Sequence, residues 1–143
     1  MGKKGNDEGS GGASEAPGGA LVLDAGALIA FERGDRRIRG LLMLAGKTRD
    51  GILVPASALA QVWRGGARSA PLVRLIVAGK VDPLDERRAK EVGERLGSRD
   101  KADIADAHVV CCAIDHDAAV VTSDRDDMEA LAESTEELVL VSV

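Results

Sequence analysis

Aromatic side chains are almost absent from this chain, which has one Phe, one Trp and no Tyr among its 143 residues. Proteins that bind single strands by stacking bases need several aromatic platforms, so that class is disfavoured. The core must be built from Ala, Val, Leu and Ile, because hydrophobic residues make up 45% of the chain. This composition and length are typical of one globular domain.

Long apolar runs, a secretion signal and spaced cysteines are also lacking. A membrane span needs roughly 18 to 20 apolar residues in succession, and no such run occurs, so we expect a cytoplasmic protein without a membrane contact. The two cysteines, Cys111 and Cys112, are neighbours and cannot link distant segments. We expect reduced thiols packed as small apolar groups, and no Cys/His spacing suggests zinc.

What is present is a regular alternation of short apolar runs with helical patterns. Residues 1–20 are rich in Gly and Ser, which predicts a disordered tail. Residues 21–143 predict a single α/β domain with a parallel sheet covered by helices on both faces. The expected strands are 21–23, 52–54, a weak strand from 81, 119–122 and 138–141. The expected helices are 25–34, 36–45, 55–63, 70–78, 85–96, 102–114 and 124–132.

Several single residues sharpen this prediction. Pro55 suits the first turn of its helix, and Trp63 is expected to turn inward as a packing anchor. Pro83 limits the weak strand to an edge or an end of the sheet. Asp85 and Asp100 are expected to be the N-caps of the helices that follow them.

The helix over 102–114 carries the most informative polar residues. Its only polar side chains up to Ile114 are Asp103, Asp106 and His108, so the helix should be largely buried. A carboxylate removed from water is costly unless it is paired, protonated or bound to a cation. We expect His108 to be a core residue or a support behind the site, and not a ligand.

Two further aspartates should join this pair. Asp24 and Asp124 follow strands, and parallel strands place such ends at one edge of the sheet. Asp103 and Asp106, at positions i and i+3, can face that edge from their helix. Four carboxylates there would form an oxygen-ligand site for a hard cation, and Mg²⁺ or Mn²⁺ fits.

Each aspartate also has a simpler explanation. Asp24 and Asp124 could be N-caps, the latter with Asp127 at the third helical position. Asp103 could complete a cap begun by Asp100. Asp106 lies deeper in its helix and is hardest to explain in this way. The acidic residues that follow Asp124 could form a solvated face: Asp126, Asp127 and Glu129.

Charge is unevenly distributed along the chain. Residues 31–74 contain nine basic and three acidic residues, whereas residues 81–143 contain seven basic and seventeen acidic ones. The two balances are therefore +6 and −10. A basic half could hold a polyanion while an acidic half holds a metal, although scattered charge on helix surfaces explains the counts equally well.

Three stretches resemble the PIN-domain family, and within it the VapC-type toxins of bacterial toxin-antitoxin pairs. They are LVLDAGALIA, VPASALAQVWRGG and DIADAHVVCCAIDHDAAVVTSDRDDM, which together span most of residues 21–143 in the order of the family. The resemblance implies a three-layer α/β/α sandwich around a short parallel sheet. It also implies an acidic pocket that binds Mg²⁺ or Mn²⁺ and cuts RNA.

Residue by residue, the resemblance makes Asp24, Asp106 and Asp124 metal ligands, and Asp103 and Asp127 match acidic positions used in some members. The chain departs from the family at Gln61, where a glutamate is usual. The amide keeps an oxygen ligand but removes a negative charge, so metal binding should be weaker.

The implied function is a metal-dependent endoribonuclease, with an antitoxin partner covering the pocket and a homodimer as the assembly. Two other interpretations stay open. One is a catalytically weakened PIN-like module that binds RNA or protein, as Gln61 would favour. The other is a phosphoacceptor or phosphatase with Asp24 as nucleophile, which is disfavoured because position 26 is Gly26 and no lysine follows Lys101.

Overall fold

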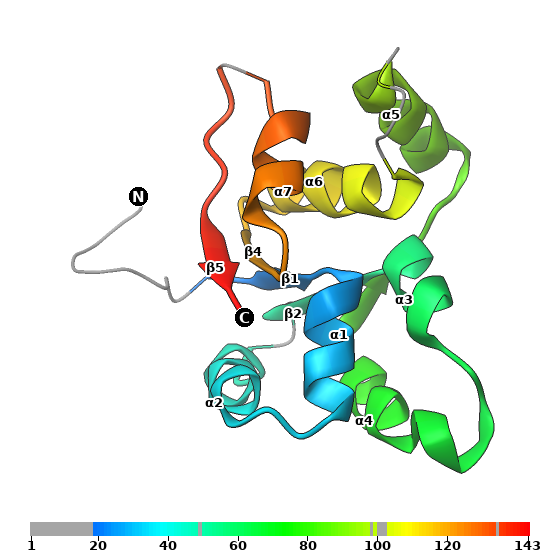
Figure 1. Cartoon of the computed structure of the whole chain (residues 1–143), viewed down its shortest axis with the longest axis vertical. Coiled ribbons are helices and arrows are strands. Elements are labelled where there is room, and N and C mark those ends of the chain that lie inside the picture. The colour runs from blue at the N-terminus through cyan, green and yellow to red at the C-terminus, as the bar shows by residue number, and fades with distance from the viewer. Residues whose placement is uncertain (1–18, 49, 98, 100–102, 134) are drawn as a thin grey trace, which may run out of the picture.

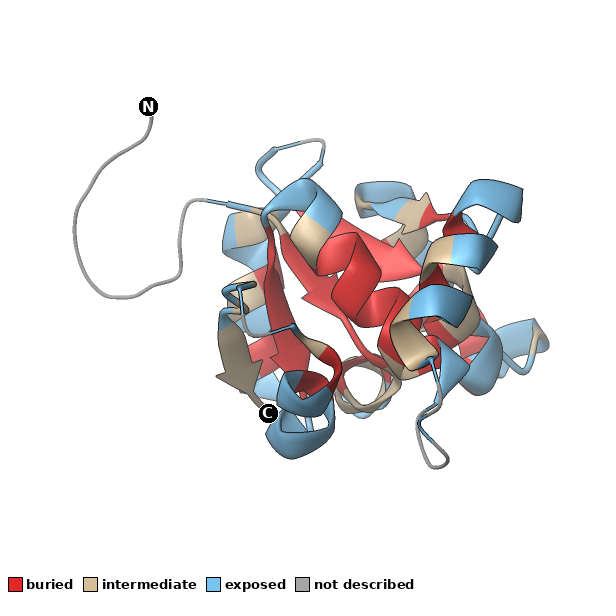
Figure 2. Cartoon of the chain, turned by 90° about the horizontal axis from the view of Figure 1, so that it is seen from above, coloured by how far each residue is buried: buried red, intermediate tan, exposed pale blue. Residues whose placement is uncertain are grey.

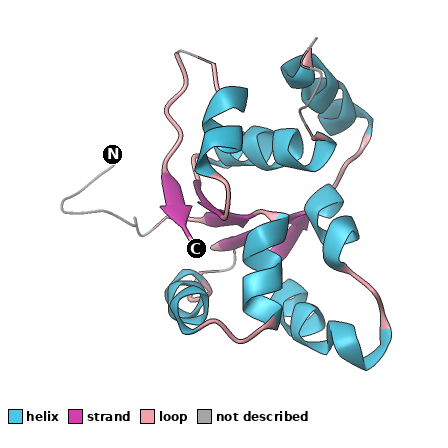
Figure 3. Cartoon of the chain, in the orientation of Figure 1, coloured by secondary structure: helices cyan, strands magenta, loops and turns pink. Residues whose placement is uncertain are grey.

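The chain folds around five parallel strands in the order β3-β2-β1-β4-β5. Figures 1 and 3 show the strands between two layers of helices. The computed structural model describes residues 19–143 except 49, 98, 100–102 and 134. The strands are short and apolar: β1 (Leu21–Leu23), β2 (Ile52–Pro55), β3 (Lys80–Asp82), β4 (Ala119–Thr122) and β5 (Leu140–Ser142). β1, β2 and β4 are buried throughout, as expected of inner strands covered on both faces.

Helices cover both faces of the sheet. On one face lie α1 (Ala25–Glu32), α2 (Arg36–Ala45) and α4 (Ala70–Ala78), preceded by the short 3₁₀ helix η2 (Gly66–Ser69). On the other lie α5 (Glu86–Leu96), α6 (Ile104–His116) and α7 (Arg125–Leu131), and α6 contacts β1, β2 and β4. Helix α3 (Ala56–Val62) touches both α1 and α6, so it joins the two layers beside the sheet.

The strand order places a switch point between β1 and β4. The chain moves outward from β1 to β2 and β3, and then returns to the other side of β1 as β4 and β5. In open α/β sheets, ligands bind beyond the carboxyl ends of the strands at such a point. Asp24 directly follows β1, and Asp124 lies two residues after β4.

The core is built from aliphatic side chains, as the composition requires. Figure 2 shows the central strands and α6 buried at the middle of the molecule. In α6, every residue from Ala107 to Ala113 is buried, including His108 and both cysteines, which are free thiols. α2 presents Ile38 and Leu42 inward. The predicted fold class is therefore confirmed, as is the position of β3 at an edge.

Some local predictions were wrong. Pro55 is the last residue of β2 and the N-cap of α3, so it precedes the helix instead of opening its first turn. Trp63 is 39% exposed, because α3 ends at Val62 and the extended backbone of Trp63 leaves the buried face. α6 begins at Ile104 with Asp103 as its N-cap, in place of Asp100. β5 begins two residues later than predicted.

Asp100 and nearly all of the predicted tail lie outside the described residues. Within the described part of the chain, no helix has both the length and the apolar character needed to cross a bilayer.

Candidate metal centre

Asp24 lies at the switch point and holds the ends of β1 and β4 together. Its Oδ1 accepts a hydrogen bond from the backbone N–H of Ala27 at 2.8 Å, which makes it the N-cap of α1. Its Oδ2 accepts from Thr122 Oγ1 at 2.5 Å and from the N–H of Ser123 at 3.3 Å. The carboxylate is buried and its orientation is fixed by both strands.

Gly26 allows this close approach. A Cβ added at Gly26 would lie 1.9 Å from Ser123 Oγ and 2.8 Å from Ser123 Cβ. Either distance is far below a van der Waals contact. The absence of a side chain at Gly26 is therefore what lets α1 begin directly against the loop between β4 and α7.

Asp124 reaches the same place from the other side of the switch point. Its backbone N–H donates to Thr122 Oγ1 at 2.8 Å, so one hydroxyl links Asp24 and Asp124. Asp124 Oδ1 accepts from the N–H of Asp127 at 3.2 Å, which makes Asp124 the N-cap of α7. A hydrogen bond between the Asp124 and Asp127 side chains, followed by the negative charge of Asp124, raises the pKa of the exposed Asp127 carboxyl.

Asp103 meets Gln61 across the contact between α6 and α3. Asp103 Oδ1 accepts from the N–H groups of Ala105 and Asp106, at 2.6 and 3.3 Å. The amide of Gln61 donates to Asp103 Oδ2 at 3.2 Å. The Gln61 amide is thus part of the acidic group, and it partners one of its carboxylates.

Asp106 is the least compensated carboxylate of the group. Among the described residues, none donates a hydrogen bond to its side chain. Burial, followed by the negative charges of nearby aspartates, raises its pKa to about 6; those aspartates are Asp103, Asp24, Asp127 and Asp124. The carboxylates predicted from distant parts of the sequence are close enough to act on the charge of Asp106, but within the described structure no three of them bring ligand oxygens within 4.8 Å of one another.

The group has no cationic partner in the part of the chain that the structure describes: no Lys, Arg or His nitrogen lies within 4.0 Å of its carboxylates. The first turns of α1, α6 and α7 offset part of the charge, because helix N-termini are positive. The cap explanation is therefore correct for Asp24 and Asp124, whereas Asp103 is itself the N-cap of α6 instead of completing a cap begun by Asp100. It does not explain why the three N-cap carboxylates lie close enough to Asp106 to raise its pKa.

The donor set fits a hard divalent cation. Carboxylate oxygens and one amide oxygen are the ligands that Mg²⁺ and Mn²⁺ take, and an unpartnered carboxylate with a raised pKa gains most from such an ion. Asp106 meets that description, and Asp24, Asp103 and Asp124 are among the carboxylates whose charge acts on it.

An arginine pocket adjoins the acidic group. It has a volume of about 370 Å³ and is lined by residues of α1 and α3 and of the segment after α3: Ile29, Glu32, Arg33, Gln61, Val62, Arg64 and Arg68. Gln61 belongs to both sites, because it lines the pocket and also donates to Asp103. Three guanidinium groups against one carboxylate make this pocket suitable for an anion.

A buried polar chain runs behind the acidic group, and the sequence reasoning missed most of it. Arg88 is 2% exposed and donates through Nε and Nη2 to both oxygens of Asp82, at 3.0 and 3.1 Å. His108 Nε2 lies 2.7 Å from Asp82 Oδ2, and His108 Nδ1 lies 2.7 Å from Ser57 Oγ. The position of Asp82, at the end of β3, was the available signal.

The charge states along this chain follow from its partners. Burial acts to raise the pKa of Asp82, but hydrogen bonds from His108 and Arg88 outweigh it and lower the pKa. Burial lowers the pKa of His108 despite the nearby carboxylate. At neutral pH, Asp82 is ionised and His108 is neutral, so Nε2 donates to Asp82 and Nδ1 accepts from Ser57.

Asp82 also lies within 4.8 Å of Cys112 and His116, a trio with metal-ligand atoms. Two observations oppose a metal there. Asp82 is already paired with the Arg88 guanidinium, and burial raises the pKa of the Cys112 thiol to about 12. A cation would have to displace one positive charge and deprotonate that thiol, so the trio does not fit a metal site.

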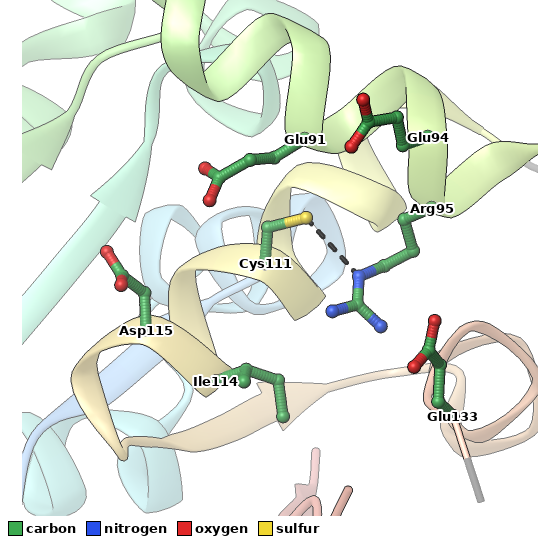
Figure 4. A pocket seen from close by; sticks show the side chains of 7 residues that line it. All are labelled: Glu91, Glu94, Arg95, Cys111, Ile114, Asp115 and Glu133. Atoms are coloured by element: carbon green, nitrogen blue, oxygen red, sulfur yellow. Dashed lines mark hydrogen bonds between the residues drawn. The ribbon is translucent and has the colours of Figure 1, made fainter.

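A second pocket, of about 260 Å³, lies between α5 and α6 (Figure 4). Arg95 Nε donates to Cys111 Sγ at 3.3 Å, and Arg95 forms a two-fold hydrogen bond with Glu136 at 2.7 and 2.9 Å. This bond lowers the pKa of Glu136 to about 2. Arg95 thereby ties α5 and α6 to the segment that leads into β5.

Comparison with known proteins identifies the family. The model of the PIN domain matches residues 21–134, and the chain belongs to the PIN-domain family. A search of curated proteins found no match.

Solved structures with the same fold include a toxin-antitoxin complex from Klebsiella pneumoniae. The chain is 15% identical to a chain of VapBC2 from Rickettsia felis bound to a DNA fragment from their promoter, with a TM-score of 0.66. The alignment covers 87% of this chain and 98% of that one. DNA-bound VapBC from Salmonella typhimurium gives 15% identity, the same two coverages and a TM-score of 0.63. FitAcB from Neisseria gonorrhoeae gives 16% identity, coverages of 84% and 95%, and a TM-score of 0.57.

Proposed function

We propose that this PIN domain is a metal-dependent endoribonuclease and the toxin of a toxin-antitoxin pair. The observation that carries the proposal is the Asp106 carboxylate, whose pKa is raised to about 6 by burial and by four neighbouring aspartates. Such an arrangement is unfavourable in the free protein, and a divalent cation would relieve it.

In this proposal, some residues of the acidic group bind the cation and others orient its ligands. Asp24, Asp106 and Asp124 would be ligands of Mg²⁺ or Mn²⁺, and Asp103 a ligand or a water-orienting group. A bound divalent cation supplies the charge that activates water and offsets the charge growing on the phosphate. Thr122 orients Asp24 and Asp124 through its hydroxyl. No histidine base is needed, which suits a chain with two histidines.

The arginine pocket supports a polyanionic substrate. Arg33, Arg64 and Arg68 line a space that touches Gln61, and Gln61 contacts Asp103. An RNA whose phosphate binds in the pocket would therefore run past the acidic group. The basic excess over residues 31–74, counted from the sequence, fits this role.

A partner protein is part of the proposal. A toxin-antitoxin complex from Klebsiella pneumoniae shares this fold, and we propose a cognate antitoxin for this chain by that analogy, together with the homodimer that the family resemblance implies. Cytoplasmic action on RNA is part of the same proposal.

The decisive experiment compares the parent with Asp106→Asn. We expect the parent to bind Mn²⁺ in a calorimetric titration and to cleave single-stranded RNA, and Asp106→Asn to lose both. Glu129→Gln, which removes an exposed charge from α7, is the matched control and should behave like the parent. Equal behaviour of the parent and Asp106→Asn would remove the nuclease proposal.

The alternative is a weakened PIN-like module that binds RNA or protein. Gln61 favours it, because the amide contributes no negative charge and is already hydrogen-bonded to Asp103. Tight RNA binding by the parent, without Mn²⁺ binding or cleavage, would select this alternative.

A further inference from the structure

β5 is an edge strand of the sheet, and one of its sides has no neighbouring strand in the described part of the chain. The backbone groups of Val139 and Val143 bond to β4, at 2.8 and 3.0 Å. Successive residues of a strand direct their N–H and C=O groups to opposite sides, so the groups of Leu140 and Ser142 point outward.

Two arginines occupy the outward carbonyls of β5. Arg37, from α2 on one face of the sheet, donates through Nη2 to Ser142 O at 3.1 Å. Arg125, from α7 on the other face, donates through Nη1 to Leu140 O at 3.1 Å and to Ser142 Oγ at 3.3 Å. These bonds block the acceptors that an added strand would need, so pairing of this edge with another strand is disfavoured.

What remains at this edge is a set of hydrogen-bond donors. The outward N–H groups of Leu140 and Ser142 remain, and each guanidinium has further N–H groups. In the described part of the chain neither arginine forms an ion pair, although Arg125 stands between Asp124 and Asp126 in the sequence. Two guanidinium groups and two backbone N–H groups without a competing acceptor fit an anion, and phosphate suits the fork of a guanidinium.

This edge adjoins the acidic group. Ser142 is paired in register with Thr122 of β4, and the Thr122 hydroxyl bonds to Asp24 and Asp124, at 2.5 and 2.8 Å. Neighbouring strands lie about 4.8 Å apart, so Ser142 is one strand away from these candidate ligands. The arginine pocket lies on the other side, because α3 follows β2, and β2 and β5 lie on opposite sides of β1.

We propose that Arg37, Arg125 and the outward N–H groups of Leu140 and Ser142 form a second phosphate-binding site for the RNA, the β5-edge site. The inference rests on the proposed function, because it takes RNA as the ligand. The arginine pocket holds the RNA on one side of the acidic group, and the β5-edge site holds it on the other. An RNA bound at both sites crosses the candidate metal ligands, where its backbone would be cut.

The salt dependence of RNA binding in EDTA tests this site without metal chemistry. Arg37→Gln/Arg125→Gln should reduce the slope of log K against log salt for a single-stranded RNA by about 0.7, the value for one phosphate contact. The matched control is Arg36→Gln/Arg87→Gln, which also removes two positive charges, from exposed positions of α2 and α5, and should keep the parent slope. Circular dichroism checks that each variant is folded.

The parent protein supplies a second measurement that needs no variant. When the ¹⁵N-labelled parent is titrated with the same RNA in EDTA, the amide signals of Leu140 and Ser142 should shift until binding saturates. The amide signals of Arg87 and Lys90 on α5 should stay in place. RNA binding that leaves the Leu140 and Ser142 signals unshifted overturns the inference, whether or not the double variant folds.

Other outcomes separate this inference from the proposed function. If the parent binds Mn²⁺ and cleaves RNA, but Arg37→Gln/Arg125→Gln keeps the parent slope and only its Tm falls, the arginines merely tie β5 to its flanking helices and this inference alone fails. If the slope changes as expected but the parent neither binds Mn²⁺ nor cleaves RNA, the site stands and the nuclease proposal fails. A parent that binds no RNA refutes both.

Discussion

Gln61 influences how much negative charge the acidic group carries. Its amide donates to Asp103 at 3.2 Å, so a glutamate there would place two carboxylates in contact. We expect Gln61→Glu to bind Mn²⁺ about 10-fold more tightly, because each added carboxylate strengthens a hard-cation site.

The matched control is Ala60→Glu, which adds the same charge to an exposed neighbouring position of α3. It should leave the Mn²⁺ affinity close to that of the parent. Equal tightening in both variants would mean that general charge, and not the Gln61 position, controls binding.

Asp106 makes the metal-free protein sensitive to pH. Its carboxyl has a pKa of about 6 in the folded chain, against 3.8 as the ordinary value. The folded state binds the proton more strongly, so the free energy of unfolding falls as pH rises from about 4 to beyond 6. The stabilising contribution is complete at low pH and lost at neutral pH.

Thermal unfolding in EDTA measures this effect. Asp106→Asn should have a higher Tm than the parent at pH 7 and nearly the same Tm at pH 4. With Mn²⁺ at pH 7 the order should reverse, because only the parent gains from the ion. A parent Tm that does not depend on Asp106 between pH 4 and 7 would contradict the prediction.

At the scale of elements, the joint between α1 and the β4–α7 loop depends on Gly26. A methyl group there would lie 1.9 Å from Ser123 Oγ. We expect Gly26→Ala to lower the free energy of unfolding by about 1–3 kcal/mol, as overpacking does elsewhere. Urea unfolding measures the loss.

Ser123→Gly supplies the control for this joint, because it removes the two atoms that the new methyl group would meet. The double variant Gly26→Ala/Ser123→Gly should recover most of the stability lost by Gly26→Ala. If Gly26→Ala is as stable as the parent, α1 does not approach this loop as closely as described.

The contact of β3, α5 and α6 depends on Arg88. This side chain is 2% exposed and pairs with Asp82, Asp115 and Glu91. Removing one partner of a buried pair leaves an uncompensated charge, so Arg88→Ala should cost about 3–5 kcal/mol in urea unfolding. Arg87→Ala removes an exposed pair of the same helix and should cost about 0.5 kcal/mol.

At the scale of the whole molecule, the arginine pocket and the acidic group are neighbours that meet at Gln61. RNA binding by Asp106→Asn, in which we expect cleavage to be lost, should weaken with salt, because each neutralised phosphate releases counterions. Replacing Arg33, Arg64 and Arg68 by Gln should reduce the slope of log K against log salt by about 2, at roughly 0.7 per phosphate contact. The control is Arg87→Gln/Lys90→Gln, which removes two exposed charges from α5 and should leave the slope unchanged.

Much of the fold could be predicted because its signals are local. Apolar runs of three or four residues predicted β1, β2 and β4, and Asp85 predicted the start of α5. The aspartates after β1 and β4 followed from one rule, that parallel strands end at the same edge. These features depend on neighbours in the sequence and on a topology that short βα units nearly impose.

The tertiary structure decided which side chains contact one another across the packed helices. The hydrogen bond of Gln61 to Asp103, and the chain from Arg88 through His108 to Ser57, depend on how α3 and α6 pack, which no local pattern encodes. Trp63 is exposed because α3 ends one residue before it. The sequence alone determined which residues could form an acidic site; the packing of distant helices determined their partners, since side-chain contacts depend on three-dimensional distance.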